Sequence, residues 1–419
     1  MFSEKSSNVS GSNETIKIAL VGCGSRGTGA AAQALQTKEP VKLWAMADLF
    51  EDRLESSLAN LIKGQAADYD RDANSSLKDR IDVPPERRFV GFDAYQKAIT
   101  SGADVVILAT HPHFRPAHFE FAVQQGKHVF MEKPIALDAP GVRNILKTNE
   151  EAKRKDLKVS VGLMFRHHRC FQETVKRLQD GAIGPVLLVQ CYWNTGFLRD
   201  TPPRPPEMSE MRYQLRNPYH FLWLSGDYIV DALLHQLDVA CWLKGAHPIN
   251  AQGQGGRTIL SETQRGDIFD HHCVEYTFPD ETKLFAQTRE IGGCWSITGT
   301  QVRGPKGTAD VGRGLIEGAN AWKFRGQATN PYQIEHNVLF DAIRNNRPQN
   351  EVDIAATSTM TAIMGRMASY SGQMIDWNMA VNSTLRLGPE KYDYDAPAPV
   401  KAGPDGNYPV AIPGVTKAF

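Results

Sequence analysis

The sequence predicts an α/β fold with an N-terminal, doubly wound parallel sheet, followed by a C-terminal α+β domain with an open, mostly antiparallel sheet. Two observations predict the first part: short apolar runs recur from residue 16 onward, and segments of helical periodicity separate them. A third predicts the second part, because beyond residue 165 apolar and polar residues alternate in strand-like runs with turn residues between them. Strands that alternate with helices favour βαβ units and hence parallel pairing.

The expected strands of the first domain are rich in β-branched residues, as strands buried on both faces are. They are residues 16–22, 41–47, 89–90, 103–110, 128–132 and 159–163. The helices between them are expected at residues 27–38, 52–63, 116–125 and 139–154, and Gly126 is expected to cap the third. The charged stretch 64–88, which carries Pro84-Pro85, is expected to be an insertion.

The second domain is expected to begin with a helix at 171–180 and a strand at 186–193. A segment rich in proline, arginine and methionine follows at 197–218, then a helical segment at 226–243 and alternating strands at 273–278 and 283–288. Two more helices are expected at 332–345 and 353–373. The predicted division is a disordered lead-in at 1–14, a first domain at 15–165, a second at 166–394 and a proline-rich C-terminal arm at 395–419.

Composition excludes several classes of protein. The 419-residue, 46.5 kDa chain carries 47 basic and 47 acidic residues, so no bulk charge favours nucleic acid or an anionic membrane surface. No run reaches the roughly 18–20 apolar residues of a membrane helix.

The first fourteen residues lack the apolar core of an export signal. The chain as given is therefore expected to be cytoplasmic, with the bacterial periplasm, after removal of such a signal, as the alternative. The six cysteines are far apart and indicate neither a zinc ribbon nor a disulfide framework.

A glycine-rich turn joins the first strand to the first helix. Residues 21–27 read VGCGSRG, which places Gly22, Gly24 and Gly27 in the spacing G-x-G-x-x-G. In this motif the first glycine permits a tight turn, the second lets a pyrophosphate approach the backbone, and the third lets the helix pack on the sheet. The intervening Ser25 and Arg26 would then lie at the helix N-terminus, where phosphates bind. The motif indicates a Rossmann domain that binds a dinucleotide.

The second strand ends at an acidic residue that selects among dinucleotides. Asp48 lies 21 residues after Gly27, where a carboxylate can accept hydrogen bonds from both ribose hydroxyls. The same carboxylate repels the 2′-phosphate of NADP, so NAD is the expected cofactor. Arg26 and Arg53 are the residues that could reverse this preference. The alternative is that the glycines serve only a turn and that Asp48 serves only as a helix cap.

Two further motifs resemble a known family. The stretches ADVVILAT, HPHFRPAH and GKHVFMEKPIALD resemble the Gfo/Idh/MocA oxidoreductases, which carry Glu-Lys-Pro at the end of a Rossmann strand, here Glu132-Lys133-Pro134. The family's Asp-x-x-x-His signature matches Asp231 to His235 within GDYIVDALLHQLD. The resemblance spans roughly residues 15–390 and implies that the second domain binds substrate and forms oligomers. The segment 192–227 resembles a branch known mainly from bacterial genomes.

The resemblance implies roles for these residues. Lys133 matches a lysine that bonds the substrate hydroxyl, Pro134 a proline that is often cis, His235 a general acid/base, and Asp231 its neighbouring carboxylate. Elementary chemistry agrees, because positions i and i+4 share a helix face and a histidine with a pKa of about 6.5 can accept a hydroxyl proton near neutral pH. A lysine at this position can stabilise the developing alkoxide.

Other candidate residues lie beside these motifs. Thr110, His111 and Glu132 are expected to contact the cofactor together with Lys133, and His111 stands where many relatives carry proline. His118, on the following helix, is expected to be structural. The substrate candidates are Arg166 and His167 in FRHHR, Trp193 and Tyr213 around the proline-rich segment, and His271 at the start of a strand.

Three functions are compatible with these features. The first is an NAD-dependent dehydrogenase of carbohydrate metabolism that oxidises a secondary hydroxyl of a sugar, glycoside or cyclitol, or reduces the ketone. The second retains NAD and uses transient oxidation to cleave glycosides or to epimerise sugars. The third, a nucleotide-sensing regulator, leaves Lys133, Asp231 and His235 unexplained. No metal is expected, because an i, i+4 Asp/His pair supplies only two of the three protein ligands of a catalytic zinc.

A homodimer or homotetramer is also expected. The second sheet is expected to have helices for one face only, and the alternating Val274, Tyr276 and Phe278 are expected on the uncovered face. An exposed apolar face favours a partner, so the sequence predicts association through this sheet.

Overall fold

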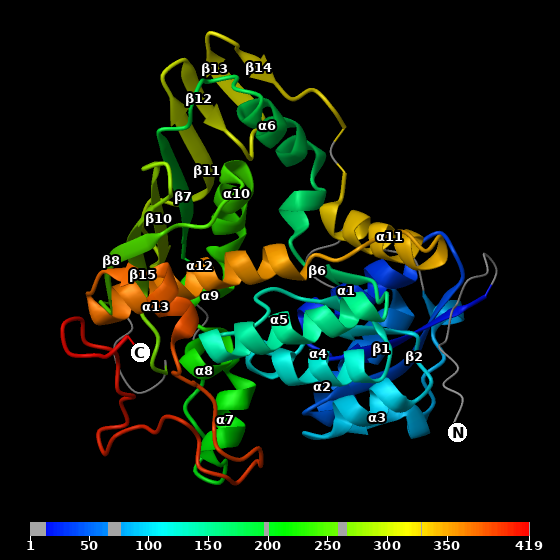
Figure 1. Ribbon diagram of the computed structural model, residues 1–419. Coiled ribbons are helices and arrows are strands. Elements are labelled where there is room, and N and C mark those ends of the chain that lie inside the picture. Colours follow the sequence, from blue (N-terminus) through cyan, green and yellow to red (C-terminus); the bar gives the residue numbers. More distant parts are fainter. Residues whose placement is uncertain (1–13, 66–76, 197–200, 259–265, 328, 419) are drawn as a thin grey trace. The chain divides into compact units, whose positions relative to one another are not determined.

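The computed structural model describes residues 14–65, 77–196, 201–258, 266–327 and 329–418. Most of the lead-in, residues 66–76 of the expected insertion and the first four residues of the proline-rich segment therefore lie outside the described residues. The described chain forms two compact units (Figure 1). Unit 1 contains residues up to 135, 144–167 and 329–354, and unit 2 contains 136–143, 168–328 and the residues from 355 onward.

Unit 1 is built on a six-stranded sheet in the order β3-β2-β1-β4-β5-β6, and all its strand pairs are parallel. The strands are β1 (Ile16–Val21), β2 (Val41–Asp48), β3 (Arg88–Val90), β4 (Val105–Leu108), β5 (His128–Met131) and β6 (Val159–Val161). Every residue of β4 is fully buried, as continuous apolar strands covered on both faces must be. The predicted doubly wound parallel sheet is confirmed.

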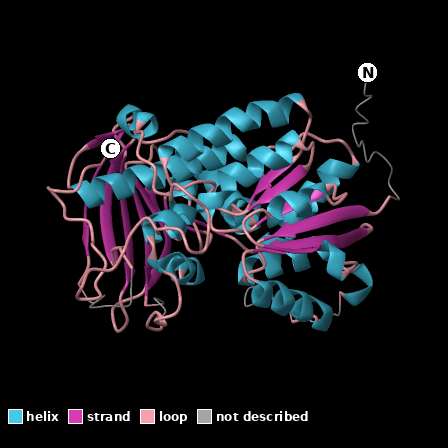
Figure 2. Cartoon of the chain, turned by 90° about the horizontal axis from the view of Figure 1, so that it is seen from below, coloured by secondary structure: helices cyan, strands magenta, loops and turns pink. Residues whose placement is uncertain are grey.

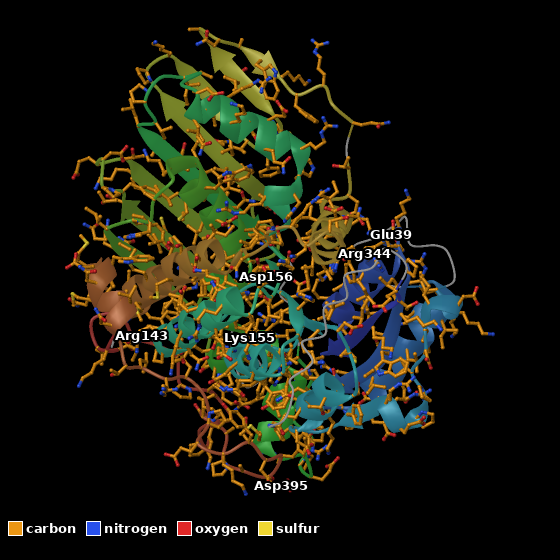
Figure 3. The ribbon with its side chains drawn as sticks, turned by 45° about the vertical axis from the view of Figure 1, so that its right-hand side comes forward. Glu39, Arg143, Lys155, Asp156, Arg344 and Asp395 are labelled. Carbon is orange, nitrogen blue, oxygen red and sulfur yellow. The ribbon has the colours of Figure 1, made fainter. Side chains whose placement is uncertain are left out.

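The helices of unit 1 follow the strands as a βαβ architecture requires. They are α1 (Ser25–Leu35), α2 (Glu51–Lys63), α3 (Ala94–Thr100), α4 (Arg115–Gln124), α5 (Ala139–Arg154), which begins in unit 2, and α11 (Pro331–Arg344), with the 3-10 turns Lys78–Arg80, Pro85–Arg87, Pro112–Phe114 and Met164–His167. Gly126 follows α4 with φ 67°, the left-handed conformation expected of a helix-ending glycine. Lys155 and Asp156, labelled in Figure 3, form the turn after α5, where Lys155 Nζ donates to the Val123 carbonyl at 2.9 Å.

The helix α11 packs in unit 1, although the sequence placed it in the second domain. Leu339, Phe340 and Ile343 join the core formed by β1, α1 and α2. Arg344 (Figure 3) donates to the backbone carbonyls of Glu14 at 3.1 Å and Pro40 at 2.6 Å. The apolar stripe of a helix shows that one face is buried but not what covers it, so chain order was a poor guide here.

Unit 2 contains a nine-stranded sheet in the order β14-β13-β12-β11-β7-β10-β9-β8-β15 among the described residues. The strands are β7 (Leu188–Thr195), β8 (Asn250–Gly256), β9 (His271–Thr277), β10 (Lys283–Glu290), β11 (Ile297–Gly304), β12 (Gly307–Asp310), β13 (Leu315–Gly318), β14 (Trp322–Lys323) and β15 (Ile375–Asp376). Only the central β7–β10 pair is parallel among the described pairs of this sheet. The predicted α+β domain with a mostly antiparallel sheet is confirmed.

Helices cover one face of this sheet, as the cyan ribbons beside the magenta strands show in Figure 2. The helices of unit 2 are α6 (Arg169–Gln179), α7 (Glu210–Arg216), α8 (Leu222–Ser225), α9 (Tyr228–Asp231), α10 (Leu234–Lys244), α12 (Val352–Ser371), which begins in unit 1, and α13 (Trp377–Asn382), with a 3-10 turn at Pro218–His220. Helix α10 packs on β7 and β11. None of the helices among the described residues is long and apolar enough to cross a membrane.

The covered face corrects one expectation about association. Val274, Tyr276 and Phe278 are fully buried and so do not form an open apolar surface. The alternate residues of β9 carry the accessible side chains: Cys273 is exposed and Glu275 is partly exposed. The apolar alternation of this strand therefore reflects packing within unit 2. The homo-oligomer stays a prediction, without these residues as its basis.

The C-terminal residues lie against α7 and the segment around it, as the red trace beside the green helix shows in Figure 1. Tyr408 donates its hydroxyl to Glu210 Oε1 at 2.5 Å and packs edge-on against Phe221, with ring centroids 5.1 Å apart. Gln214 Nε2 donates to the Val400 carbonyl at 2.7 Å. The described residues of the expected arm form neither helix nor strand and pack within unit 2.

Candidate functional site

The turn between β1 and α1 is shaped by its three glycines. A Cβ on Gly22, which has φ 98°, would lie 2.5 Å from the Thr110 backbone nitrogen, and a Cβ on Gly27 would lie 1.9 Å from the Gly22 carbonyl oxygen. A Cβ on Gly24 would meet nothing within 4 Å. Two glycines therefore permit close backbone contacts, whereas the third keeps the surface above the helix N-terminus open.

The N-terminus of α1 is suited to an anion. Gly24 is its N-cap, and within the described chain no side chain caps this helix and no acidic residue stands in its first turn. Backbone N–H groups at a helix N-terminus carry partial positive charge and bind phosphate groups. Ser25 begins the helix, as the motif predicts.

An open pocket lies beside this turn, over the carboxyl ends of β1, β2 and β4. Five of the predicted cofactor residues line it: Gly22, Gly24, Asp48, Thr110 and His111. The other predicted cofactor residues, namely Ser25, Arg26, Gly27, Glu132 and Lys133, are not part of its wall.

Asp48 is held in this pocket by backbone donors. Its Oδ2 accepts from the Cys23 N–H at 2.7 Å and its Oδ1 from the Phe50 N–H at 2.9 Å. Burial raises the pKa of Asp48, while these two hydrogen bonds and the nearby Arg53 act in the opposite direction. Each carboxylate oxygen can accept more than one hydrogen bond, so both remain able to accept from ribose hydroxyls.

Aromatic rings form the far wall of the pocket. Tyr95 stacks on His118 with ring centroids 4.0 Å apart, and the Phe114 ring is stacked with His118 at 6.0 Å. Burial, together with the charge of Arg115, lowers the pKa of His118 to about 3, so its imidazole is neutral at physiological pH. A flat, neutral aromatic wall suits a nucleotide base. Sequence reasoning missed Tyr95 because the helix α3 that carries it gave no motif.

The two arginines that could favour NADP occupy different places. Arg26 turns toward the interior of unit 1, where its Nε lies 2.9 Å from Glu132 Oε1 and its guanidinium lies 4.8 Å from the centre of the Tyr332 ring. Arg53 lines the pocket and lies over the Phe50 ring at 5.8 Å. Arg53 is therefore the cation that stands near Asp48.

The end of β5 carries Glu132, Lys133 and a cis peptide bond between Lys133 and Pro134. The buried Arg115 supports this turn, because its guanidinium donates to the Pro134 carbonyl and, at 2.5 Å, to the Thr110 carbonyl. One cation therefore joins the ends of β4 and β5. Nothing in the sequence around Arg115 indicated this role, because these two acceptors are backbone atoms.

A second carboxyl group lies buried near Glu132. Glu335 on α11 is fully buried, and burial together with the charge of Glu132 raises its pKa well above the ordinary range. Arg26 is the cation that acts on Glu335 in the opposite direction. Burial and the neighbouring carboxylate therefore outweigh the one guanidinium in their effect on the pKa of Glu335.

Asp231 and His235 lie in unit 2, on two short helices rather than on one. Asp231 is the last residue of α9, and His235 is the second residue of α10. Between them the Leu233 N–H bonds the Tyr228 carbonyl, five residues back, at 3.0 Å. This inserts a local bulge of the kind common at functional sites. This bulge corrects the expectation that Asp231 and His235 share one face of a regular helix at i and i+4.

The aromatic candidate Trp193 lies beside His235. The two rings are stacked at 26° with their centroids 5.9 Å apart, because β7 passes under α10. Trp193 is partly exposed and His235 is buried at 8 % exposure. The structure therefore brings these two predicted residues together.

The remaining substrate candidates are divided between the two units: Tyr213 and His271 lie in unit 2, and Arg166 and His167 lie in unit 1. Tyr213 is buried, and its hydroxyl donates to the Pro202 carbonyl at 3.0 Å. His167 is buried in unit 1 against Glu351, with Nε2 and Oε1 2.9 Å apart, and Arg166 lies partly exposed in the preceding 3-10 turn.

His271 points to the other face of the sheet in unit 2. Thr288 pairs with both Trp193 and His272, so these three share a face, whereas His271 shares the opposite face with Arg289. There His271 Nδ1 lies 2.7 Å from the buried Asp270 Oδ1. Among the described residues no group of three histidine, cysteine or acidic side chains is arranged to hold a metal ion.

Comparison with known proteins shows which family the first part of the chain is similar to. Residues 16–163 match the model of an oxidoreductase family with an NAD-binding Rossmann fold, the Gfo/Idh/MocA family. The match covers the glycine turn, Asp48 and Lys133. It confirms the family resemblance drawn from the motifs and the prediction of an NAD-binding Rossmann domain.

The similar curated proteins are bacterial. An inositol 2-dehydrogenase of Ralstonia nicotianae is 27% identical over 241 residues, 57% of this chain and 57% of that protein. A scyllo-inositol 2-dehydrogenase (NAD(+)) of Bacillus subtilis is 27% identical over 179 residues, 42% of this chain and 46% of that protein. These matches span about half the length of the curated relatives.

Solved structures share the fold over most of the chain. A scyllo-inositol dehydrogenase from Lactobacillus casei, solved with NAD(H) and scyllo-inositol, superimposes with a TM-score of 0.61 at 18% identity, over 87% of this chain and 100% of that one. An aldose-aldose oxidoreductase from Caulobacter crescentus gives a TM-score of 0.64 at 18% identity over 87% and 100%. At such identity the likeness establishes the fold.

We predict that alanine at two glycines of the turn affects different properties: stability at one and NAD binding at the other. Gly27→Ala should destabilise unit 1 by about 3 kcal/mol or more, because the added methyl overlaps a backbone carbonyl. Gly24→Ala should change stability by less than about 0.5 kcal/mol but weaken NAD binding at least tenfold, because the methyl fills the approach to the backbone. Urea unfolding and isothermal titration measure the two effects. Equal stability of both variants would contradict the assignment.

We predict that His118 makes unit 1 sensitive to acid. Its folded-state pKa of about 3 lies below the ordinary value of 6.5, so its contribution is full above pH 6.5 and is lost as pH falls toward 3. At pH 4.5 His118→Phe, which keeps the stacking, should therefore recover on the order of 2 kcal/mol relative to its effect at pH 8. Thr110→Val, which removes the Thr110–His118 hydrogen bond and keeps the imidazole, should show no such recovery in urea unfolding.

Proposed function

We propose that the protein is an NAD-dependent dehydrogenase that oxidises a secondary hydroxyl of a cyclitol or a sugar, or reduces the corresponding ketone. The observation that carries the proposal is the family match over residues 16–163, on a turn and a pocket whose geometry suits a dinucleotide. The relatives named as inositol dehydrogenases support a polyhydroxylated substrate. They favour net oxidation over glycoside cleavage or epimerisation.

The described residues fit the proposed cofactor. The uncapped N-terminus of α1 and the open surface above Gly24 suit the pyrophosphate, and Asp48 suits the adenosine ribose. The stacked ring of Tyr95 suits the base. When bound, NAD supplies the group that accepts the hydride.

The residues of the chain supply the proton chemistry in this proposal. His235 accepts the proton of the substrate hydroxyl, and Asp231 favours the positively charged imidazole that results. Lys133 stabilises the alkoxide as it forms. A dehydrogenase must lower the energy of the negative charge that develops on this oxygen. Trp193 stacks on His235 and offers an aromatic surface to the C–H face of a ring. Arg115 holds the backbone that carries Lys133 through the Pro134 carbonyl.

We predict that the protein binds NAD(H) at least tenfold more tightly than NADP(H). The carboxylate of Asp48 and a 2′-phosphate would repel each other at hydrogen-bond distance. Titration of both dinucleotides measures the ratio. Asp48→Asn should reduce the preference, and Arg53→Ala should increase it, because Arg53 is the cation in the same pocket. Equal affinities in the unmodified protein would overturn the role given to Asp48.

We predict that Lys133→Met and His235→Ala each lower kcat by about 100-fold or more, since a positioned acid or base contributes about 10²–10⁴-fold. The affinity for NAD should change by less than about threefold, because neither residue lines the pocket beside Asp48. Lys147→Met and His247→Ala are the matched controls and should retain activity. Initial rates of NADH formation on a panel of inositols, aldoses and glycosides provide the measurement. Full activity of either test variant would place the chemistry elsewhere.

The same panel separates the proposed reaction from the redox-neutral alternative. A dehydrogenase forms NADH in proportion to the substrate consumed, and product analysis shows the ketone. If a sugar is cleaved or epimerised while added NAD is not reduced in that proportion, net oxidation is refuted and the retained-NAD reaction is established.

A further inference from the structure

The residue that immediately precedes α9 has a backbone conformation that side chains rarely permit. Asp227 has φ 72° and ψ 164°. This region is essentially restricted to glycine and costs other residues on the order of 1–3 kcal/mol. The preceding Gly226 also has a positive φ, 77°. A conformation of this kind persists only where the surroundings over-determine it.

The surroundings of Asp227 hold it in this conformation through contacts with its side chain, which is fully buried. Its Oδ1 accepts from the Tyr228 N–H at 2.5 Å. Its Oδ2 accepts from the Phe269 N–H at 2.9 Å and from the Tyr370 hydroxyl at 2.5 Å, and His272 Nε2 lies 3.2 Å away. Burial alone would raise the pKa of Asp227, but His272 and these donors leave it below the ordinary value. The carboxylate is therefore a buried, fully paired anion.

The partners of this carboxylate are fixed in turn. His272 Nδ1 lies 2.9 Å from the Ser369 hydroxyl, on the same helix, α12, that carries Tyr370. Arg366, one turn earlier on α12, donates to the Gly226 carbonyl at 3.3 Å. Strand β9 and helix α12 thus hold the two residues that precede α9. A buried network of hydrogen bonds and an ion pair of this kind rigidifies the segment it contacts.

The main chain of Asp227 transmits this constraint to the residues assigned to proton chemistry. Its carbonyl accepts from the Val230 N–H at 3.0 Å and from the Asp231 N–H at 2.9 Å. Because α9 is only four residues long, these bonds determine its register. His235 follows through the Ala232 carbonyl, which accepts the His235 N–H at 3.3 Å.

We propose that Asp227 is a positioning residue, whose buried carboxylate, held by Tyr370, His272 and the Phe269 N–H, fixes the segment from Asp231 to His235 on the sheet of unit 2. The proposal rests on the function proposed for Asp231 and His235. It assigns to Asp227 no contact with substrate. Loss of its carboxylate lowers kcat and leaves NAD affinity unchanged, because the pocket beside Asp48 belongs to unit 1.

The test is Asp227→Gly. Glycine adopts this backbone conformation without cost, so the variant keeps the turn and loses only the carboxylate. We expect kcat to fall at least tenfold with NAD affinity within threefold of the unmodified protein. We also expect faster amide hydrogen exchange at residues 230–235. Tyr370→Phe, which removes one of the donors, should lower kcat by a smaller factor and guards against failure of the glycine variant to fold.

The matched control is Glu281→Gly, also an acidic residue at positive φ in unit 2, φ 64°, but exposed in the turn between β9 and β10. It should change neither rate nor exchange near α9. If Asp227→Gly accelerates exchange while kcat is unchanged, or exchanges like the unmodified protein, the positioning role is overturned. If the unmodified protein reduces no NAD with any carbohydrate of the panel, the proposed function fails. The exchange measurement alone then tests whether Asp227 holds residues 230–235 in place.

Discussion

The close approach of the β1–α1 turn to the end of β4 is the constraint on which the cofactor half of the molecule depends. The Gly22 Cα faces the Thr110 backbone so closely that any side chain would overlap it, and Gly27 faces the Gly22 carbonyl in the same way. These contacts bring the N-terminus of α1 to the carboxyl edge of the sheet. Asp48 and Thr110 lie at that edge because parallel strands all end there. The pocket is therefore a consequence of backbone packing.

Each unit contains a buried charge that supports a candidate functional segment. Arg115 joins the ends of β4 and β5 through two backbone carbonyls, and Asp227 fixes the start of α9 through backbone and side-chain donors. A buried charge is costly unless it is fully paired, so each of these residues tolerates few arrangements of its neighbours. Because few arrangements pair these buried charges, the backbone that carries Lys133 and the backbone that carries Asp231 are each held in one position. Neither supporting residue has to touch a substrate.

Local sequence determined the parts of the protein whose physical causes are local. The apolar run 16–21 is a buried strand, the glycine spacing gives the turn, and Asp48 ends the second strand beside it. Lys133 follows β5 and precedes a cis proline, as the family resemblance implies. The order of strands and helices sufficed for a parallel sheet because crossover connections between consecutive strands permit few topologies.

Tertiary structure alone decided which surfaces meet. The apolar faces of α11 and β9 were evident, but their partners were not: α11 joined unit 1, and Val274 turned inward. Arg26 was assigned to the phosphates from its place in the motif, yet it pairs with Glu132, and the bulge at Leu233 changed the relation of Asp231 to His235. Tyr95 and Glu335 carried no motif at all, and Arg115 lay within HPHFRPAH without an assigned role. Periodicity and spacing indicate the local structure that a residue forms with its neighbours in the chain. The burial and charge of these side chains depend instead on contacts between segments far apart in sequence, which the sequence by itself does not pair.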